Sequence, residues 1–202
     1  KVSLEQDDFI AQVNKIGLAV IGQSEGLAPA DKKLYALRDV TGTVDSIPLI
    51  ASSVMSKKLA SGAQAILLDV KVGSGAFMKT LDDARALAKA MVDIGNENGR
   101  SVKAVLTDMD RPLGHAIGNA LEVIDTLKGH GPQDLTHECL IMAAHMLVLS
   151  HICDYETALS RVNKALESGE ALERLRLMIE AQGGNSHVID DESLLAIGTF
   201  TY

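Results

Sequence analysis

The sequence predicts an α/β protein in which helices cover a parallel or mixed β-sheet. Short apolar runs that end near glycine alternate with longer segments in which apolar residues recur at helical spacing. Of the 202 residues, 47% are hydrophobic, which is enough to build a core. Because the chain has no tryptophan and only three phenylalanines and three tyrosines, aliphatic residues and methionine must form that core.

The amino-terminal part predicts a helix, a strand and a second helix. Apolar residues at helical spacing indicate a helix over 7–15. The apolar run 18–21 is typical of a short buried strand. A loop is expected over 24–29, after which Asp31 is placed to cap a helix that continues to about Arg38.

The middle of the chain predicts a strand–helix–strand unit preceded by a helix. Pro48 lies in the first turn of a helix expected to end near Leu59. The segment 64–72 reads as a strand that is apolar on both faces, which suits the interior of a helix-covered sheet. A long amphipathic helix over 81–98 and a second strand over 100–106 follow.

The rest of the chain, from about residue 116, has mostly helical periodicity. Its breaks fall at 129–132, at Asp154 and at 183–184. The helical stretch from about 30 to 60 lies between two predicted strands and reads as a small lobe of its own. Its flanks, 23–28 and 61–62, contain the small residues that a hinge uses.

Composition excludes several classes of function. A net charge of −8 argues against a nucleic-acid partner, which requires a basic stripe. No apolar run approaches the roughly 20 residues of a membrane span, so no membrane partner is expected. Cys139 and Cys153 are expected to be buried, reduced thiols, which fits a cytoplasmic protein. Because Lys1 is not a methionine, we expect the chain to be part of a longer protein.

Three polar residues form the first candidate site. Ser53 and Lys57 are four positions apart, so they share one face of a helix, roughly 6 Å apart at the backbone. Arg38 ends the preceding helix and is separated from them by a short turn. Together they would bind an electron-rich planar ligand and stabilise negative charge on it. The alternative is a solvated helix face with a cation at a helix C-terminus.

The glycine-rich segment 69–77 is the second candidate. Its glycines follow a strand, where backbone N–H groups often bind anions. The glycine spacing matches neither the dinucleotide fingerprint nor the P-loop. A tight turn that places Phe77 near a cleft is therefore favoured over a phosphate cradle. No catalytic role is assigned to the histidines, which are His115, His130, His137, His145, His151 and His187.

Three sequence blocks carry a resemblance to a known family. They are PADKKLYALRDVTGTV at 29–44, SIPLIASSVMSKK at 46–58 and LDVKVGSGAFM at 68–78. In order and spacing they resemble the thymidine and pyrimidine-nucleoside phosphorylase family. The resemblance continues to about Leu195 and so covers nearly the whole chain.

The resemblance implies an enzyme of pyrimidine salvage, a pentosyltransferase. Its reaction is the reversible phosphorolysis of uridine, thymidine and deoxyuridine to the free base and (deoxy)ribose 1-phosphate. Arg38, Ser53 and Lys57 match the family residues that hold the carbonyl and N3 edge of the pyrimidine. The matching wall of the base pocket consists of Tyr35, Val44, Ile50 and Phe77.

The resemblance also implies two lobes and a homodimer. Residues 30–61 would belong to a small helical lobe that carries the base site and the dimer contact. Residues 1–29 and 62–202 would belong to a large mixed-sheet α/β lobe. Inorganic phosphate is the implied co-substrate, and no organic cofactor is required.

The chain departs from the family in two places. The phosphate-binding segment and a base-contacting histidine of the family match nothing after Lys1, so residues 1–202 alone are expected to be inactive. In some members a glutamate and two backbone carbonyls, here those of Leu113 and Ala116, hold a monovalent cation such as potassium. About three residues, that glutamate among them, are absent after Val123, so the cation site is expected to be incomplete.

Two alternatives remain open from the sequence. One is a phosphoribosyltransferase with the same two-lobe fold, although the Arg38, Ser53 and Lys57 constellation does not suit its magnesium–diphosphate site. The other is a non-catalytic fragment or binding module of a phosphorylase.

Overall fold

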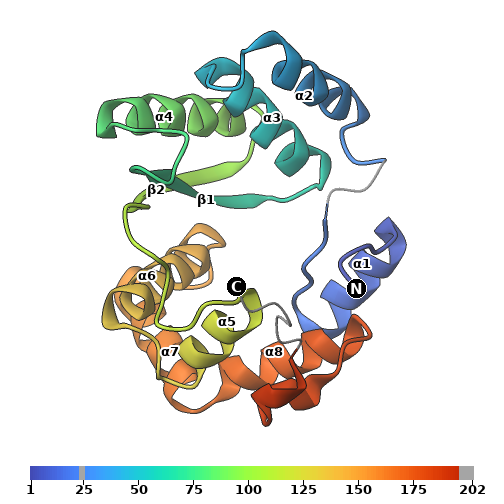
Figure 1. Ribbon diagram of the computed structural model, residues 1–202, viewed down its shortest axis with the longest axis vertical. Helices are drawn as coiled ribbons and strands as arrows, with labels where there is room; N and C mark the ends of the chain where they lie inside the picture. Colours follow the sequence, from blue (N-terminus) through green and yellow to red (C-terminus); the bar gives the residue numbers. More distant parts are fainter. Residues whose placement is uncertain (23–25, 196–202) are drawn as a thin grey trace, which may run out of the picture. The chain divides into compact units, whose positions relative to one another are not determined.

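The computed structural model describes residues 1–22 and 26–195 and confirms the α/β class (Figure 1). The chain forms two compact units, one of residues 1–24, 114–136 and 163–202, the other of residues 25–113 and 137–162. In chain order the elements are α1 (Gln6–Ile16), α2 (Pro29–Thr41), α3 (Ile47–Ala60), β1 (Ala65–Val72), α4 (Leu81–Glu97), β2 (Ser101–Asp108), α5 (Asn119–Leu127), α6 (Gln133–Leu149), α7 (Tyr155–Glu167), α8 (Glu170–Ala181) and the 3₁₀ helices η1 (Ser186–Ile189) and η2 (Glu192–Leu194).

A β–α–β unit forms the centre of the second compact unit. β1 and β2 run parallel and pair in register from Ala65 with Ser101 to Val72 with Asp108. Helix α4 connects them, as a parallel pair requires. Thr80 is the N-cap of this helix, and its side-chain oxygen accepts a hydrogen bond from the backbone N–H of Asp83 at 3.2 Å. The predicted strands and the helix between them are therefore confirmed.

The core of this unit lies on one face of the strands. Helices α3 and α4 pack on that face (Figure 1). Alternate residues of β1, namely Ile66, Leu68 and Val70, are buried against Met55 and Met91. This alternation corrects the prediction of an apolar strand on both faces.

The other face of β1 carries polar side chains. Lys71 forms ion pairs with Asp69 at 2.8 Å and with Glu138 of α6 at 2.9 Å. These ion pairs lie on the face of β1 for which the sequence suggested packing against apolar residues.

Helix α4 lies very close to β2 at Gly95. A Cβ atom at this position would lie 2.2 Å from Cγ2 of Val102 on β2. Such a contact is impossible without displacing the strand or the helix. Glycine at position 95 therefore sets the distance between α4 and β2.

The first compact unit contains no strand at 18–21, where one was expected. The side-chain amide of Gln182 bonds both backbone groups of Val20, accepting from its N–H at 3.0 Å and donating to its carbonyl at 2.8 Å. Gln12 donates to the same amide at 3.2 Å. Because one side chain satisfies the groups that a neighbouring strand would bond, this segment is extended without joining a sheet.

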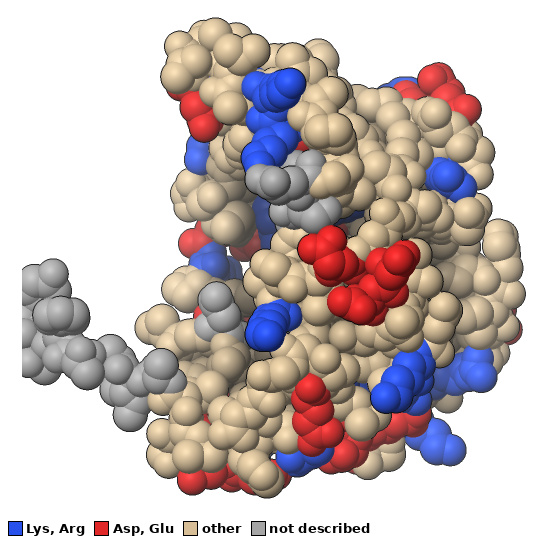
Figure 2. Space-filling model, turned by 90° about the vertical axis from the view of Figure 1, so that its right-hand side faces the viewer, with Lys and Arg blue, Asp and Glu red and all other residues tan. Residues whose placement is uncertain are grey.

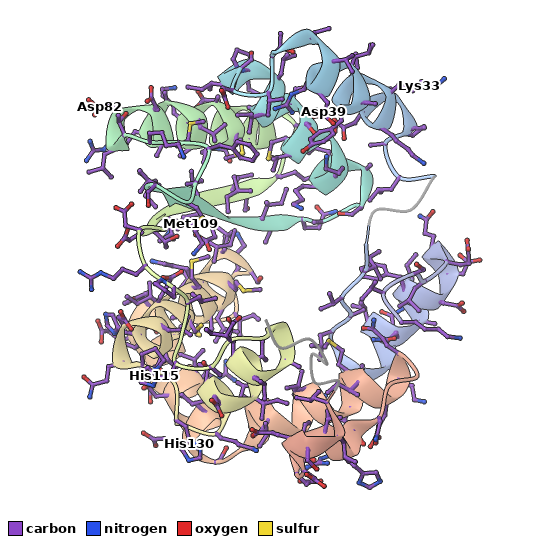
Figure 3. All side chains as sticks on the ribbon, viewed as in Figure 1. Lys33, Asp39, Asp82, Met109, His115 and His130 are labelled. Atoms are coloured by element: carbon purple, nitrogen blue, oxygen red, sulfur yellow. The ribbon has the colours of Figure 1, made fainter. Side chains whose placement is uncertain are left out.

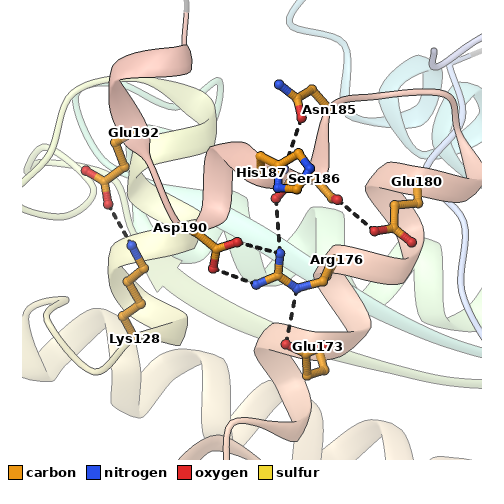
Figure 4. A network of polar contacts seen from close by, with 9 residues as sticks. All are labelled: Lys128, Glu173, Arg176, Glu180, Asn185, Ser186, His187, Asp190 and Glu192. Carbon is orange, nitrogen blue, oxygen red and sulfur yellow. Dashed lines mark hydrogen bonds and ion pairs between the residues drawn. The ribbon is translucent and has the colours of Figure 1, made fainter.

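An arginine-centred network holds η1 to α8 in the same unit (Figure 4). Arg176 donates two hydrogen bonds to Asp190, at 2.8 and 2.9 Å, and one to Glu173 at 3.2 Å. These bonds, chiefly that to Asp190, raise the pKa of Arg176, and the guanidinium lowers the pKa of Asp190. Ser186 adds a 2.7 Å bond to Glu180.

Three further expectations meet different outcomes. Both cysteines are free, but Cys139 is exposed, so the prediction of two buried thiols is wrong. Cys139 lies on α6, whose apolar residues surround the helix, and periodicity did not reveal its outer face.

Helices α2 and α3 lie in the same compact unit as the strands, and the helical lobe of residues 30–61 stays a prediction. Within 1–22 and 26–195, no helix has the length and apolar composition of a membrane span.

Replacing Gly95 with alanine tests the contact between α4 and β2. We expect the variant to lose about 1–3 kcal/mol of unfolding free energy, because overpacking strains the core. Thermal unfolding should show a lower Tm than for Gly22→Ala, where a Cβ meets only ordinary contact at 3.7 Å. Adding Val102→Ala to Gly95→Ala should restore part of the loss. An unchanged Tm in Gly95→Ala would contradict the geometry.

Candidate active site

A tight turn brings the end of α2 against α3. Gly42 ends α2 in the left-handed conformation, with φ 65°, and its N–H bonds the carbonyl of Arg38. Ser46 precedes α3, and Pro48 lies in its first turn, as predicted. The chain therefore reverses within a few residues, and the last turn of α2 faces α3.

Lys57 joins the two helices by hydrogen bonds. Its ammonium donates to the Asp31 carboxylate at 2.7 Å and to the Ser53 hydroxyl at 2.9 Å. Asp31 is only 8% exposed. Burial alone would raise the pKa of Asp31, but hydrogen bonds from Lys57 and Ser53, with the charges of Lys57 and Arg38, lower it. The carboxylate therefore remains ionised at neutral pH.

Arg38 lies in the last turn of α2, and its side chain is buried, with only 7% of the residue exposed. Its Nη2 donates to the backbone carbonyl of Val44. Within the described part of the chain, its buried Nε has no hydrogen-bond partner. The Tyr35 ring lies near both cations, with its centroid 5.1 Å from the Arg38 guanidinium carbon and 5.9 Å from the Lys57 nitrogen.

A small cavity of about 140 Å³ opens at this cluster. Pockets that enclose drug-sized ligands measure roughly 300–1,000 Å³, so this one suits a single heterocyclic ring. Its lining residues include Asp31, Tyr35, Arg38, Ser52 and Ser53. Lys57 does not line the cavity but is hydrogen-bonded to Ser53, which does. A guanidinium, a hydroxyl and an aromatic ring around a small cavity can bind a planar polar ring and stabilise negative charge on it.

The predicted wall of the base pocket is divided between two cavities. Tyr35 lines the small one, and Val44 adjoins it through the carbonyl that binds Arg38. Ile50 and Phe77 instead line a cavity of about 560 Å³ beside β1. Phe77 is 60% exposed. The structure thus gathers Arg38, Ser53 and Lys57, while the roles of all seven residues stay predictions.

The glycine-rich turn after β1 favours the tight-turn interpretation over a phosphate cradle. The N–H groups of Gly73 and Gly75 donate to backbone carbonyls at 3.0 and 3.1 Å. The N–H of Ser74 donates to the Asp110 carboxylate. That backbone bond is the main cause of the lowered pKa of Asp110. With its donors satisfied and a carboxylate beside it, the turn is a poor phosphate site.

Asp31 is the residue that sequence reasoning misassigned. The helix begins at Pro29 after Ala28, so Asp31 does not cap it but lies in its first turn, where it accepts a hydrogen bond from Lys57. One feature of the sequence could have revealed this position. Asp31, Tyr35 and Arg38 are spaced at i, i+4 and i+7, which places all three on one helix face.

The remaining candidate groups lie outside both cavities. None of the histidines lines either cavity, and His115 and His130, labelled in Figure 3, belong to the other compact unit. In the ranges that the structure describes, no three acidic, histidine or cysteine side chains gather as a metal site. Leu113 and Ala116 fall where the chain passes between the units, and their cation site stays a prediction.

The charge on one face of the molecule is mixed in sign. On the face in Figure 2, the described lysines and arginines are dispersed among acidic groups instead of forming one basic stripe. The net charge of −8 acts in the same direction.

Titration of Asp31 tests the cluster. By NMR, the Asp31 carboxyl should titrate below its usual pKa of about 3.9, and in Lys57→Ala it should titrate above that value, because burial then dominates. A lowered folded pKa stabilises the fold above pH ~4, and this stability is lost as pH falls through the folded value. The stability difference between the proteins should therefore shrink in acid. The control is Lys33→Ala, which removes a different lysine of α2, labelled in Figure 3. If Lys57→Ala left the Asp31 titration unchanged, the ion pair would be wrong.

Known proteins resemble the chain over nearly its whole length. It is 58% identical over 198 residues to the pyrimidine-nucleoside phosphorylases of Geobacillus stearothermophilus and Bacillus subtilis (strain 168), which covers 96% of this chain and 46% of each relative. The enzyme of that name from Staphylococcus haemolyticus is 57% identical over 203 aligned residues, covering 98% of the chain and 47% of the relative. The chain thus spans about half the length of these relatives, and the resemblance seen in its sequence is confirmed. The family model described as "Glycosyl transferase family, a/b domain" matches residues 1–172, and the chain therefore belongs to that family.

Proposed function

We propose that the protein containing this chain catalyses the reversible phosphorolysis of pyrimidine nucleosides. The substrates are uridine, thymidine and deoxyuridine with inorganic phosphate, and the products are the free base and (deoxy)ribose 1-phosphate. The observation that carries the proposal is that the buried Arg38 and Ser53 line a ring-sized cavity, with Lys57 hydrogen-bonded to Ser53. The names of the relatives, 58% identical, support the same reaction.

The cluster suits the charge that this reaction develops. As a phosphate oxygen attacks C1′ of the pentose, the C1′–N1 bond breaks and its electron pair leaves with the base. The departing pyrimidine becomes an anion whose charge lies largely on its carbonyl oxygens. Preorganised donors aimed at those oxygens lower the barrier, because they bind the transition state more strongly than the neutral nucleoside.

Arg38 lines the cavity, and Lys57 is hydrogen-bonded to Ser53, which also lines it. Nε of Arg38 is buried without a protein partner among the residues described, so a ligand reaches it only when the side chain shifts. Lys57 uses two hydrogens, for Asp31 and Ser53, and retains a third for a ligand. Phosphate is assigned to residues outside this chain, because the turn at Ser74 is closed by Asp110.

The residues fit a monovalent cation only in part. The carbonyls of Leu113 and Ala116 would be two ligands. This is fewer oxygens than a hard cation takes, and no step is assigned to potassium.

A homodimer through α2 forms part of the proposal. Leu34, Leu37 and Val40 are exposed at i, i+3 and i+6 and form an apolar stripe on that helix. Val40 is 80% exposed. Contiguous exposed apolar residues of this kind mark interaction surfaces. Free thiols support the proposed cytoplasmic location.

Arg38→Ala tests the role of the cluster. In the full-length protein, kcat/KM for uridine should fall by roughly 10² or more, because an anion-stabilising donor is lost. Release of uracil in phosphate buffer gives the rate. Lys33→Ala removes an exposed cation from the same helix and should stay within about twofold of wild type. Near-normal activity in Arg38→Ala would remove this residue from the site.

Val40→Glu tests the apolar stripe. A charge placed in an apolar interface is costly to desolvate, so sedimentation should show the variant as a monomer at concentrations where wild type is a dimer. Ile10→Glu changes an exposed apolar residue on α1 and should leave the dimer intact. A monomeric wild type, or a dimeric Val40→Glu, would contradict the interface.

A further inference from the structure

The end of α4 carries an asparagine that is followed by glycine. Among the asparagines of the chain, only Asn98 has this neighbour. A side-chain amide of asparagine can react with the backbone nitrogen of the next residue, and a glycine there has no Cβ to shield that nitrogen. Asn98 and Gly99 are both exposed. Asn98 is therefore the asparagine of this chain best placed to lose its side-chain amide.

Two solvent-exposed hydrogen bonds hold the reacting groups. Nδ2 of Asn98 donates to the carbonyl of Ile94 at 2.8 Å, and the N–H of Gly99 donates to the carbonyl of Asn96 at 3.0 Å. A Cβ built on Gly99 would meet no described atom within 4 Å, so the turn has room to move. Because the ends of helices open at little cost in free energy, both bonds can break without disturbing the core. The reaction should then follow the fraying of this turn.

We propose that Asn98 is a site of spontaneous deamidation in the native protein and that it reacts through the frayed last turn of α4. The backbone nitrogen of Gly99 attacks Cγ of Asn98. A new N–Cγ bond forms as the Cγ–Nδ2 bond breaks, and ammonia leaves with the proton from Gly99. Water then opens the cyclic imide, giving aspartate when the Cγ–N bond is cleaved and isoaspartate when the bond to the backbone carbonyl is cleaved. This chemistry is independent of the proposed phosphorolysis.

Either product changes the turn that joins α4 to β2. Aspartate replaces a donor with a carboxylate next to the Ile94 carbonyl, at the end of the helix where the macrodipole disfavours negative charge. Isoaspartate lengthens the backbone between Asn98 and Gly99 by one methylene group. Gly95 and Val102, on either side of this turn, are packed without space for a Cβ. Deamidation should therefore loosen the contact between α4 and β2.

Peptide mapping of the full-length protein tests the site. After incubation in warm neutral buffer, trypsin, which cleaves after lysine and arginine, releases residues 90–100. Fragment masses should place the exchange of an amide for a carboxyl at Asn98 instead of Asn96, with isoaspartate among the products. The internal control is Asn14, an exposed asparagine of α1 that precedes a lysine. Asn98 should be converted roughly tenfold faster than Asn14 or more, because glycine leaves the attacking nitrogen unshielded.

Two matched variants separate the site from its consequence. Asn98→Gln keeps an amide on a longer side chain that closes the imide ring more slowly, so residues 90–100 should keep their mass. Asn98→Asp copies one product and should have a lower Tm than Asn98→Gln. Equal Tm values for the two variants would contradict the loosening of α4.

Unfolding the protein tests the route. In urea, where the bonds to Ile94 and Asn96 are lost, Asn98 should react roughly tenfold faster than in the native protein. Equal rates in the two states would show that fraying does not limit the reaction. The inference would be overturned by an unmodified Asn98 in the aged native protein, by a rate no faster than that of Asn14, or by a mass gain that persists in Asn98→Gln.

Discussion

The site depends on the packing of one helix, α3. Ala51 and Met55 lie on one face of it, and both are almost completely buried against α4 and the strands. Ser53 and Lys57 are each two residues further along, which is about 200° around the helix, on the opposite face. Any rotation of α3 that moved Lys57 away from Asp31 would also expose Met55. The apolar core therefore fixes the direction of the polar cluster.

That arrangement places charges where they are costly. A buried ion pair often adds less stability than apolar residues of the same volume, because both charges lose water. In this cluster the cost is reduced by hydrogen bonds, since Lys57 bonds both Asp31 and Ser53. Part of Arg38 remains unsatisfied, because its buried Nε has no partner in the described chain. A polar group held in this way is more readily explained by ligand binding than by stability.

The sequence predicted those parts of the fold that depend on local periodicity. β1, α4 and β2 were placed within two residues, because apolar spacing and the glycines after β1 act within one segment. The strand at 18–21 was wrong because Gln182, more than 150 positions away, bonds Val20. No local pattern contains that contact.

The same limit applies to the site. Ser53 and Lys57 were found because they are four apart on one helix, and Arg38 because a short turn follows it. Asp31 was read as a helix cap, because its partner Lys57 lies on the next helix and only the spacing from Tyr35 and Arg38 indicates the shared face. The separation of Ile50 and Phe77 from the small cavity also depends on tertiary packing, which the motif resemblance alone does not describe.

Charge balance connects the cluster to the proposed phosphorolysis. Arg38, Lys57 and Asp31 together carry a net charge of +1, which is equal in size and opposite in sign to the charge of one departing base anion. A neutral nucleoside entering the cavity meets a site that is nearly compensated and does not require a counterion. When the glycosidic bond breaks, the same groups carry the excess positive charge that the anion needs, without reorganisation. Removing Asp31 would raise the resting charge to +2 and favour binding of any small anion, phosphate included, in the base cavity. In the proposed reaction, the carboxylate would thus help to keep phosphate out of the cavity that we propose for the base.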